Sequence, residues 1–167
     1  MPPNEIESGV LNGQLHVGVV PELRAFPGLT YTSLYKEKSL LYCSDQHPLF
    51  KQNLYDISDD ALAKYDAVVS RYPQSPEIKQ QQRKLKATAS STDREGIAFL
   101  ILTGRFIGFL PTHFAQRWTD QDKIHSIGAH GRDFYTNFSI ITSKGARSHL
   151  ILDAFLEELK IQGSPIV

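Results

Sequence analysis

Segments with the two-residue period of β-strands alternate with helical segments along almost the whole chain, and this alternation most restricts how it can fold. The predicted strands lie at 15–20, 29–43, 67–70, 85–89, 106–110, 124–127 and 134–142. The predicted helices lie at 6–11, 61–65, 77–84, 95–103, 111–118 and 148–160. Strands and helices in alternation favour an α/β fold whose strands pair mostly in parallel.

Two of these segments carry more specific expectations. Residues 29–43 are rich in strand-forming side chains but contain Lys36-Glu37-Lys38 in the middle, which predicts two strands separated by a polar break. In the segment 95–103, apolar side chains occupy most of the helix surface, so we expect this helix to be buried on more than one side.

Length, charge and targeting signals limit the class of protein. With 167 residues, the chain is expected to form one domain, with two small lobes as an alternative. Lys and Arg total 18 and Asp and Glu total 18, which leaves no basic surplus for wrapping nucleic acid. Neither an apolar run of roughly 20 residues nor a signal peptide is recognisable, so we expect a cytoplasmic protein without membrane contact.

Motifs for catalysis and metal binding are missing from the sequence. It contains no nucleophile elbow, phosphate-binding loop or dinucleotide-binding glycine motif. Cys43 near His47 is the one thiol–imidazole proximity, and Cys43 is expected to be a small buried residue rather than a nucleophile. His125 and His130 are more simply surface or core histidines than metal ligands. We therefore expect no enzyme activity, no cofactor and no metal.

Four stretches, taken in order, suggest a known family. They are the helix, turn and strand at 9–20, the strand and Asp45-Gln46-His47-Pro48-Leu49 turn within 31–50, the helix, Gly104, strand and Leu110-Pro111 within 92–114, and the strand and Phe155-containing helix after 134. Together they resemble the effector-binding domain of LysR-type transcriptional regulators, and the resemblance covers about residues 6–160.

This resemblance implies a two-lobed domain of the type II periplasmic-binding-protein kind. The first lobe is expected to combine 1–38 with 131–167, and the second lobe to span 39–130. Members of the family begin with a winged helix-turn-helix domain and a linker helix, and their effector domain opens with a strand, a helix and a second strand. Because none of these is recognisable here, the chain is expected to be truncated at its N-terminus, with an incomplete first lobe.

The resemblance also places a small-molecule effector in a crevice between the lobes, outside the carboxyl ends of the strands. The residues that the pattern puts there are Val20, Pro21, Tyr72, Pro73, Gln74, Ser75, Leu110 and Pro111. Ser75 begins a helix and would suit a carboxylate. Simpler structural roles remain open: a rigid loop for Tyr72-Pro73, a helix cap for Ser75, and a strand-to-helix stop for Leu110-Pro111.

The function implied is that of a ligand-sensing regulatory domain. An effector would shift the population of conformations, and the oligomer would pass the change to DNA-binding domains outside this chain. A homo-oligomer is expected, with a dimer changed or weakened by the missing opening elements. Two alternatives remain open: a solute-binding protein of a transporter with the same fold, and an enzyme built on the same scaffold, for which no acid–base pair is recognisable.

Overall fold

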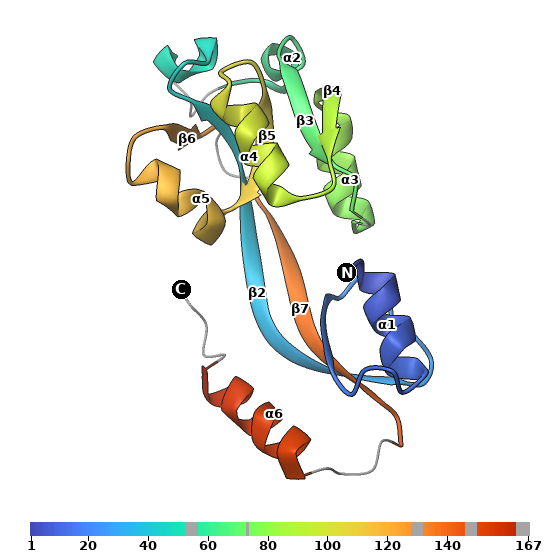
Figure 1. The fold of residues 1–167 in the computed structure, drawn as a ribbon. Helices are drawn as coiled ribbons and strands as arrows, with labels where there is room; N and C mark the ends of the chain where they lie inside the picture. The colour runs from blue at the N-terminus through green and yellow to red at the C-terminus, as the bar shows by residue number, and fades with distance from the viewer. Residues whose placement is uncertain (53–56, 73, 128–131, 146–149, 163–167) are drawn as a thin grey trace. The chain divides into compact units, whose positions relative to one another are not determined.

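The computed structural model describes residues 1–52, 57–72, 74–127, 132–145 and 150–162 (Figure 1). Its helices are α1 (Pro3–Leu11), the 3-10 helix η1 (Pro48–Lys51), α2 (Asp59–Leu62), α3 (Pro76–Arg83), α4 (Arg94–Leu102), α5 (Thr112–Thr119) and α6 (Leu150–Gln162). Its strands are β1 (Gly18–Pro21), β2 (Leu29–Ser44), β3 (Asp66–Ser70), β4 (Lys86–Ser91), β5 (Ile107–Pro111), β6 (Ile124–Ser126) and β7 (Phe134–Ser143). The predicted α/β fold is confirmed.

The chain divides into two compact units. The first unit comprises Met1–Glu37 with Tyr135–Val167, and the second unit is Lys38–Phe134. Since these boundaries fall within β2 and at the start of β7, the chain passes from one unit to the other inside these two strands. Hydrogen-bonded strand neighbours follow the order β1-β7-β2-β5-β3-β4, and β6 pairs with β2.

The expectation of mostly parallel pairing is wrong. β3 is parallel to β4 and to β5, but β1–β7, β2–β5 and β2–β6 are antiparallel. Alternation of strands and helices identifies crossovers between successive strands. It does not determine the partners of strands far apart in the sequence, such as β2 and β5.

The predicted polar break at Lys36-Glu37-Lys38 is also wrong, because β2 is a single strand of 16 residues. The segment contains no Gly, Pro, Asn or Asp, so it lacks the residues that most strongly favour a turn. The charged side chains are accommodated within the strand. Glu37 is buried, and the Lys36 ammonium lies 4.4 Å from the centroid of the Tyr135 ring.

Alternate residues of the second unit's strands pack into two hydrophobic clusters, as expected for a sheet covered on both faces. One cluster contains Tyr42, Val68, Ile97, Ala98, Ile101, Leu110, Phe114, Ala115 and Ile124. The other contains Leu41, Cys43, Leu49, Ile57, Leu62, Ala67, Ile107 and Ile127. Helices α4 and α5 therefore cover one face, and η1 and α2 cover the other. In α4, three residues are buried while the Phe99 side chain is 66% exposed.

A smaller core holds the first unit together. Val10, Val20, Leu29 and Ile141 form its buried centre, so α1 packs against β1, β7 and the start of β2. Gly18 permits this approach, because a Cβ at this position would overlap the Ile6 side chain.

Burial of His47 makes stability depend on pH. Its Nδ1 accepts a hydrogen bond from the Leu49 N–H at 3.2 Å, and burial lowers the pKa of the ring below its ordinary value of 6.5. The unfolded chain therefore binds more protons at this residue below pH 6.5. We expect the free energy of unfolding to fall as the pH falls through this range, by at most about 1.4 kcal/mol per pH unit from this residue.

Urea denaturation between about pH 7.5 and about pH 5 measures this effect. The matched variant is His47→Asn, which keeps a side-chain acceptor for the helix start but does not titrate here. Its stability should depend less on pH than that of the wild type. Equal pH dependence in both proteins would show that His47 is not the responsible group.

Candidate functional site

The carboxyl ends of three parallel strands define the candidate site in the second unit. Because β3 pairs in parallel with both β4 and β5, all three strands end at the same edge of the sheet. Each is followed by a helix: α3 after β3, α4 after β4, and α5 after β5. Loops at the carboxyl ends of parallel strands are the usual ligand-binding region of open α/β sheets. We call this region the carboxyl edge.

The three helix N-termini at the carboxyl edge differ in how their backbone N–H groups are satisfied. Asp93 caps α4, with Oδ1 accepting a hydrogen bond from the Gly96 N–H at 2.6 Å. Ser75 caps α3, with Oγ accepting from the Ile78 N–H at 3.4 Å. Glu77 lies in the first turn of α3. Its carboxylate accepts hydrogen bonds from the Ser75 hydroxyl and from the Glu77 backbone N–H, and these lower the pKa of Glu77. Carboxylates therefore already occupy two of the three N-termini.

Helix α5 differs from its two neighbours. Its N-cap residue, Pro111, makes no side-chain hydrogen bond to the first turn, and this turn contains no acidic residue. The N-terminus of a helix carries a partial positive charge and favours an anion. At the carboxyl edge, the start of α5 is thus the helix terminus with the greatest remaining capacity for a negative group.

The loop after β3 contains four of the predicted site residues. Its backbone is tied to the sheet, since the Arg71 N–H donates to the Ser91 carbonyl at 2.9 Å and the Tyr72 N–H donates to Ser70 Oγ at 3.1 Å. The Tyr72 side chain is 44% exposed, and Gln74 and Ser75 are half-buried. Pro73 lies outside the described residues.

The remaining predicted residues contribute differently. Leu110 is 1% exposed within the core under α4 and α5, and Val20 is fully buried in the core of the first unit. Both residues, backbone included, are therefore shielded from solvent in this structure. Pro111 is buried opposite Ser39 of β2, and Pro21 is half-buried opposite Phe138 of β7.

Polar residues near these positions were missed by the sequence reasoning. In the first unit, the buried Ser139 hydroxyl donates a hydrogen bond to the Glu22 carboxylate, next to Pro21. In the second unit, Ser39 is buried beside Pro111. No local signal distinguishes either serine, because both strands contain several other polar residues.

Cys43 and the candidate metal ligands have surroundings that can be examined in the described part of the chain. Burial raises the pKa of the Cys43 thiol to about 12, so it carries no thiolate at neutral pH. Among the described residues, no group of three or more His, Cys, Asp or Glu side chains is placed to hold a metal ion. His130, one half of the considered histidine pair, lies outside them.

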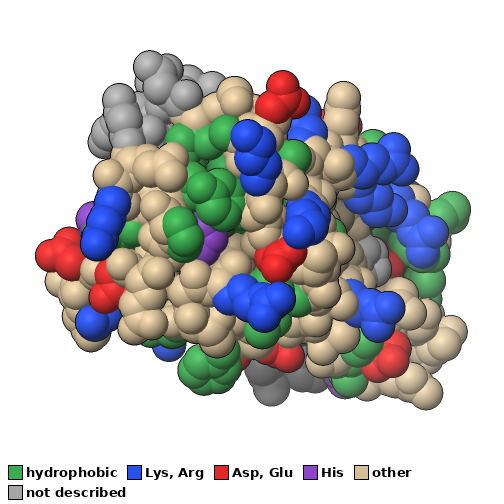
Figure 2. All heavy atoms as spheres, turned by 90° about the horizontal axis from the view of Figure 1, so that it is seen from above, with side chains coloured by type: hydrophobic (Ala, Val, Ile, Leu, Met, Phe, Trp, Pro, Cys, Tyr) green, Lys and Arg blue, Asp and Glu red, His purple; other side chains and the backbone are tan. Residues whose placement is uncertain are grey.

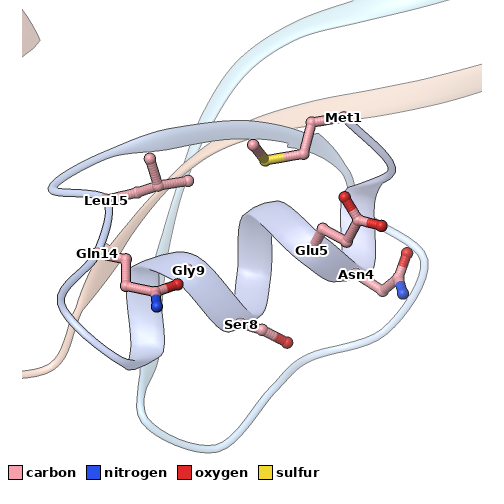
Figure 3. Close-up of a pocket in the computed structure, with 7 residues that line it drawn as sticks. All are labelled: Met1, Asn4, Glu5, Ser8, Gly9, Gln14 and Leu15. Atoms are coloured by element: carbon pink, nitrogen blue, oxygen red, sulfur yellow. The ribbon is translucent and has the colours of Figure 1, made fainter.

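A hollow of about 400 Å³ lies elsewhere, in the first unit (Figure 3). Its lining consists of Met1, Asn4, Glu5, Ser8, Gly9, Gln14 and Leu15, so it is formed by α1 and the residues on either side of it. None of the predicted site residues lines it. Its polar side chains project from the outer surface of one helix and a turn, and no buried polar group converges there to orient a ligand.

The molecular surface is mixed in charge. Figure 2 shows Lys and Arg side chains lying among Asp and Glu side chains on one face. In the second unit, ion pairs join Lys84 to Asp59 and Lys86 to Asp66. Across the described residues, no helix has the length and apolar character required to cross a membrane.

Residues 1–163 match the family model described as the LysR substrate binding domain. The chain is 43% identical over 159 residues to the HTH-type transcriptional activator BauR of Pseudomonas aeruginosa, covering 95% of this chain and 52% of that protein. It thus spans about half the length of this curated relative.

Two solved structures illustrate the similarity of fold. The regulatory domain of CcmR from Synechocystis PCC6803, in complex with 2-PG, has a TM-score of 0.80 at 14% identity, covering 99% of this chain and 82% of that chain. The effector binding domain of QuiR in complex with shikimate has a TM-score of 0.78 at 14% identity, covering 98% of this chain and 78% of that chain. At 14% identity, these two similarities are evidence about the fold alone.

Proposed function

The chain belongs to the LysR substrate-binding domain family, and from this we propose that it is the effector-binding, regulatory part of a transcriptional regulator. The observation that carries the proposal is the family match over residues 1–163, in a chain 43% identical to a transcriptional activator. That relative is a regulator of transcription, which favours the sensor over the solute-binding protein of a transporter. The family is one of transcriptional regulators rather than of enzymes.

For the whole protein, we propose transcription regulation in the cytoplasm by a homo-oligomer. DNA would be contacted through a winged helix-turn-helix domain rather than through these residues, whose charges sum to zero. An effector that binds one conformation more tightly raises its population, and this shift is the signal passed to the DNA-binding domains. We propose that the domain itself carries out no catalysis and needs no cofactor or metal.

We propose that the effector is a small molecule with an anionic group, and that the carboxyl edge of the second unit contacts it. Tyr72, Pro73, Gln74 and Ser75 would contribute from the loop after β3. Leu110 and Pro111 are buried at the end of β5 and remain part of the proposed contact set through their position beside the start of α5, where Pro111 makes no side-chain hydrogen bond. In the first unit, Val20 and Pro21 remain part of the proposed contact set. The α5 N-terminus gives the main physical reason for an anion.

Thermal unfolding in the presence of small carboxylates tests this proposal. A compound at 100 times its dissociation constant stabilises the folded state by about 2.7 kcal/mol, which raises Tm by roughly 5–11 °C for a chain of this size. The control for each active compound is its neutral amide, which should stabilise far less. Absence of stabilisation by every carboxylate, or equal stabilisation by the amide, would contradict the proposed site chemistry.

A further inference from the structure

Asn12 and Gly13 form the turn that ends helix α1 in the first unit. The chain contains four asparagines, at positions 4, 12, 53 and 137, and Asn12 is the one that precedes a glycine. Because glycine carries no Cβ, its backbone nitrogen is readily approached by a neighbouring side chain. An asparagine before glycine therefore places an electrophilic side-chain amide next to an unusually accessible backbone nitrogen.

The structure leaves the Asn12 side chain open to solvent. Asn12 is exposed, and within the described part of the chain its side-chain amide makes no hydrogen bond. The space around the next residue is open as well, since a Cβ added at Gly13 would meet no atom within 4 Å. No packing or hydrogen-bond partner thus has to be displaced before the Asn12 amide reacts.

The backbone of this turn is held only by the bonds of a helix end. The Asn12 N–H donates to the Ser8 carbonyl at 3.0 Å, and the Gly13 N–H donates to the Val10 carbonyl at 3.3 Å. The Gly13 bond is longer than about 3.2 Å, the upper end of the usual range for N–H···O bonds. Helix ends fray more easily than helix interiors, so the Gly13 nitrogen can turn toward the Asn12 side chain without unfolding of the core.

We propose that Asn12 is a site of covalent modification, at which the side-chain amide is hydrolysed through a cyclic imide. The Gly13 backbone nitrogen attacks Cγ of Asn12, the N–Cγ bond forms, and the Cγ–Nδ2 bond breaks. Nδ2 leaves as ammonia and takes the proton that the Gly13 nitrogen gives up. Water then opens the imide at either carbonyl carbon and returns a proton to this nitrogen. Position 12 becomes aspartate or isoaspartate, with one water consumed and one ammonia released.

Both products place a new carboxylate at the C-terminal end of α1. That end carries a partial negative charge, and the last turn of α1 contains no basic residue to balance it. In isoaspartate the main chain also gains one atom, which changes the turn that leads from α1 toward β1. Because Val10 in this last turn is buried in the core of the first unit, the modification loosens the packing of α1 there.

Incubation of the folded chain at mildly alkaline pH in H₂¹⁸O tests the site. Digestion after glutamate in ordinary water separates Asn4 from Asn12, and mass spectrometry measures the ¹⁸O taken up at each position. Asn12 should take up label at least about ten times faster than Asn4 and Asn137, which lie inside α1 and β7. The labelled product should separate into aspartate and isoaspartate forms, as opening of an imide requires.

Two variants isolate the chemistry from its consequence. Asn12→Gln keeps a primary amide at the end of α1 but lengthens the side chain, which disfavours the ring, so it should keep its amide. Asn12→Asp introduces the charge directly. Backbone amides of α1 should exchange with solvent about two to five times faster in Asn12→Asp than in Asn12→Gln, and those of α4 should be unchanged.

The outcomes decide both parts of the proposal. Equal uptake at Asn12 and Asn137, uptake only after unfolding in urea, or an aspartate product without isoaspartate overturns the modification site. Unchanged exchange of α1 in Asn12→Asp, or acceleration that extends to α4, overturns the proposed effect on α1. Preferential labelling of Asn12 in the folded chain, with faster exchange confined to the first unit, supports both.

Discussion

Ile101→Ala is expected to lower the free energy of unfolding of the second unit by about 2–5 kcal/mol. Ile101 is fully buried in the cluster between the sheet and helices α4 and α5. Its Cδ1 lies against β5, since a Cβ added at Gly108 would come within 3.2 Å of it. Truncation removes apolar contacts and leaves a cavity that the close-packed neighbours fill only in part.

Phe99→Ala is the control for this prediction, because Phe99 lies on the same helix but is 66% exposed. Its cost should stay within about 0.5 kcal/mol, apart from any change in helix propensity. Urea denaturation of the wild type and both variants gives the comparison. Similar losses in the two variants would mean that α4 does not bury the face assigned to it.

Tyr72→Ala is expected to weaken binding of the effector by about tenfold or more, or at least about 1.4 kcal/mol, with little change in stability. Tyr72 is 44% exposed, and its backbone is held by Ser70, so loss of the ring leaves the loop's hydrogen bond in place. Aromatic side chains with this exposure provide large contact area when a ligand covers them.

Isothermal titration of the most strongly stabilising carboxylate measures this effect, with Phe99→Ala again as control. Phe99 is an even more exposed aromatic residue of the second unit, but it lies in the middle of α4 rather than in a loop after a strand. Its substitution should leave affinity unchanged. Equal affinity of Tyr72→Ala and the wild type would remove the loop after β3 from the site.

The succession of helices and strands could be predicted from the sequence because each element carries its own local signal. The alternation in 134–142 and the apolar run in 95–103 correspond to β7 and α4 within one or two residues. The partners of the strands and the length of β2 could not be predicted in the same way. The charged residues at 36–38 looked like an interruption, but they continue β2. The Lys36 ammonium packs on the ring of Tyr135 in β7, about a hundred residues later in the chain.

The sequence allowed us to predict which segments contribute to the candidate site, but not the directions in which their side chains point. Residues at the ends of 67–70 and 106–110 were expected at one edge of a sheet, and the parallel pairing of β3 with β5 places them there. The Leu110 side chain, however, faces the core. Successive side chains of a strand point to opposite faces, so a shift of one residue along the strand changes which side chains face the core. The hydrogen bond between Ser139 and Glu22 joins residues far apart in sequence, so no local pattern announces it.

We propose that a small anionic molecule binds at the carboxyl edge of the second unit. The most direct test is a ¹H–¹⁵N NMR titration of the chain with its most strongly stabilising carboxylate. The largest shift changes should occur at Tyr72, Gln74, Ser75 and Thr112, around the starts of α3 and α5. Changes confined to the residues lining the hollow beside α1 would contradict the claim.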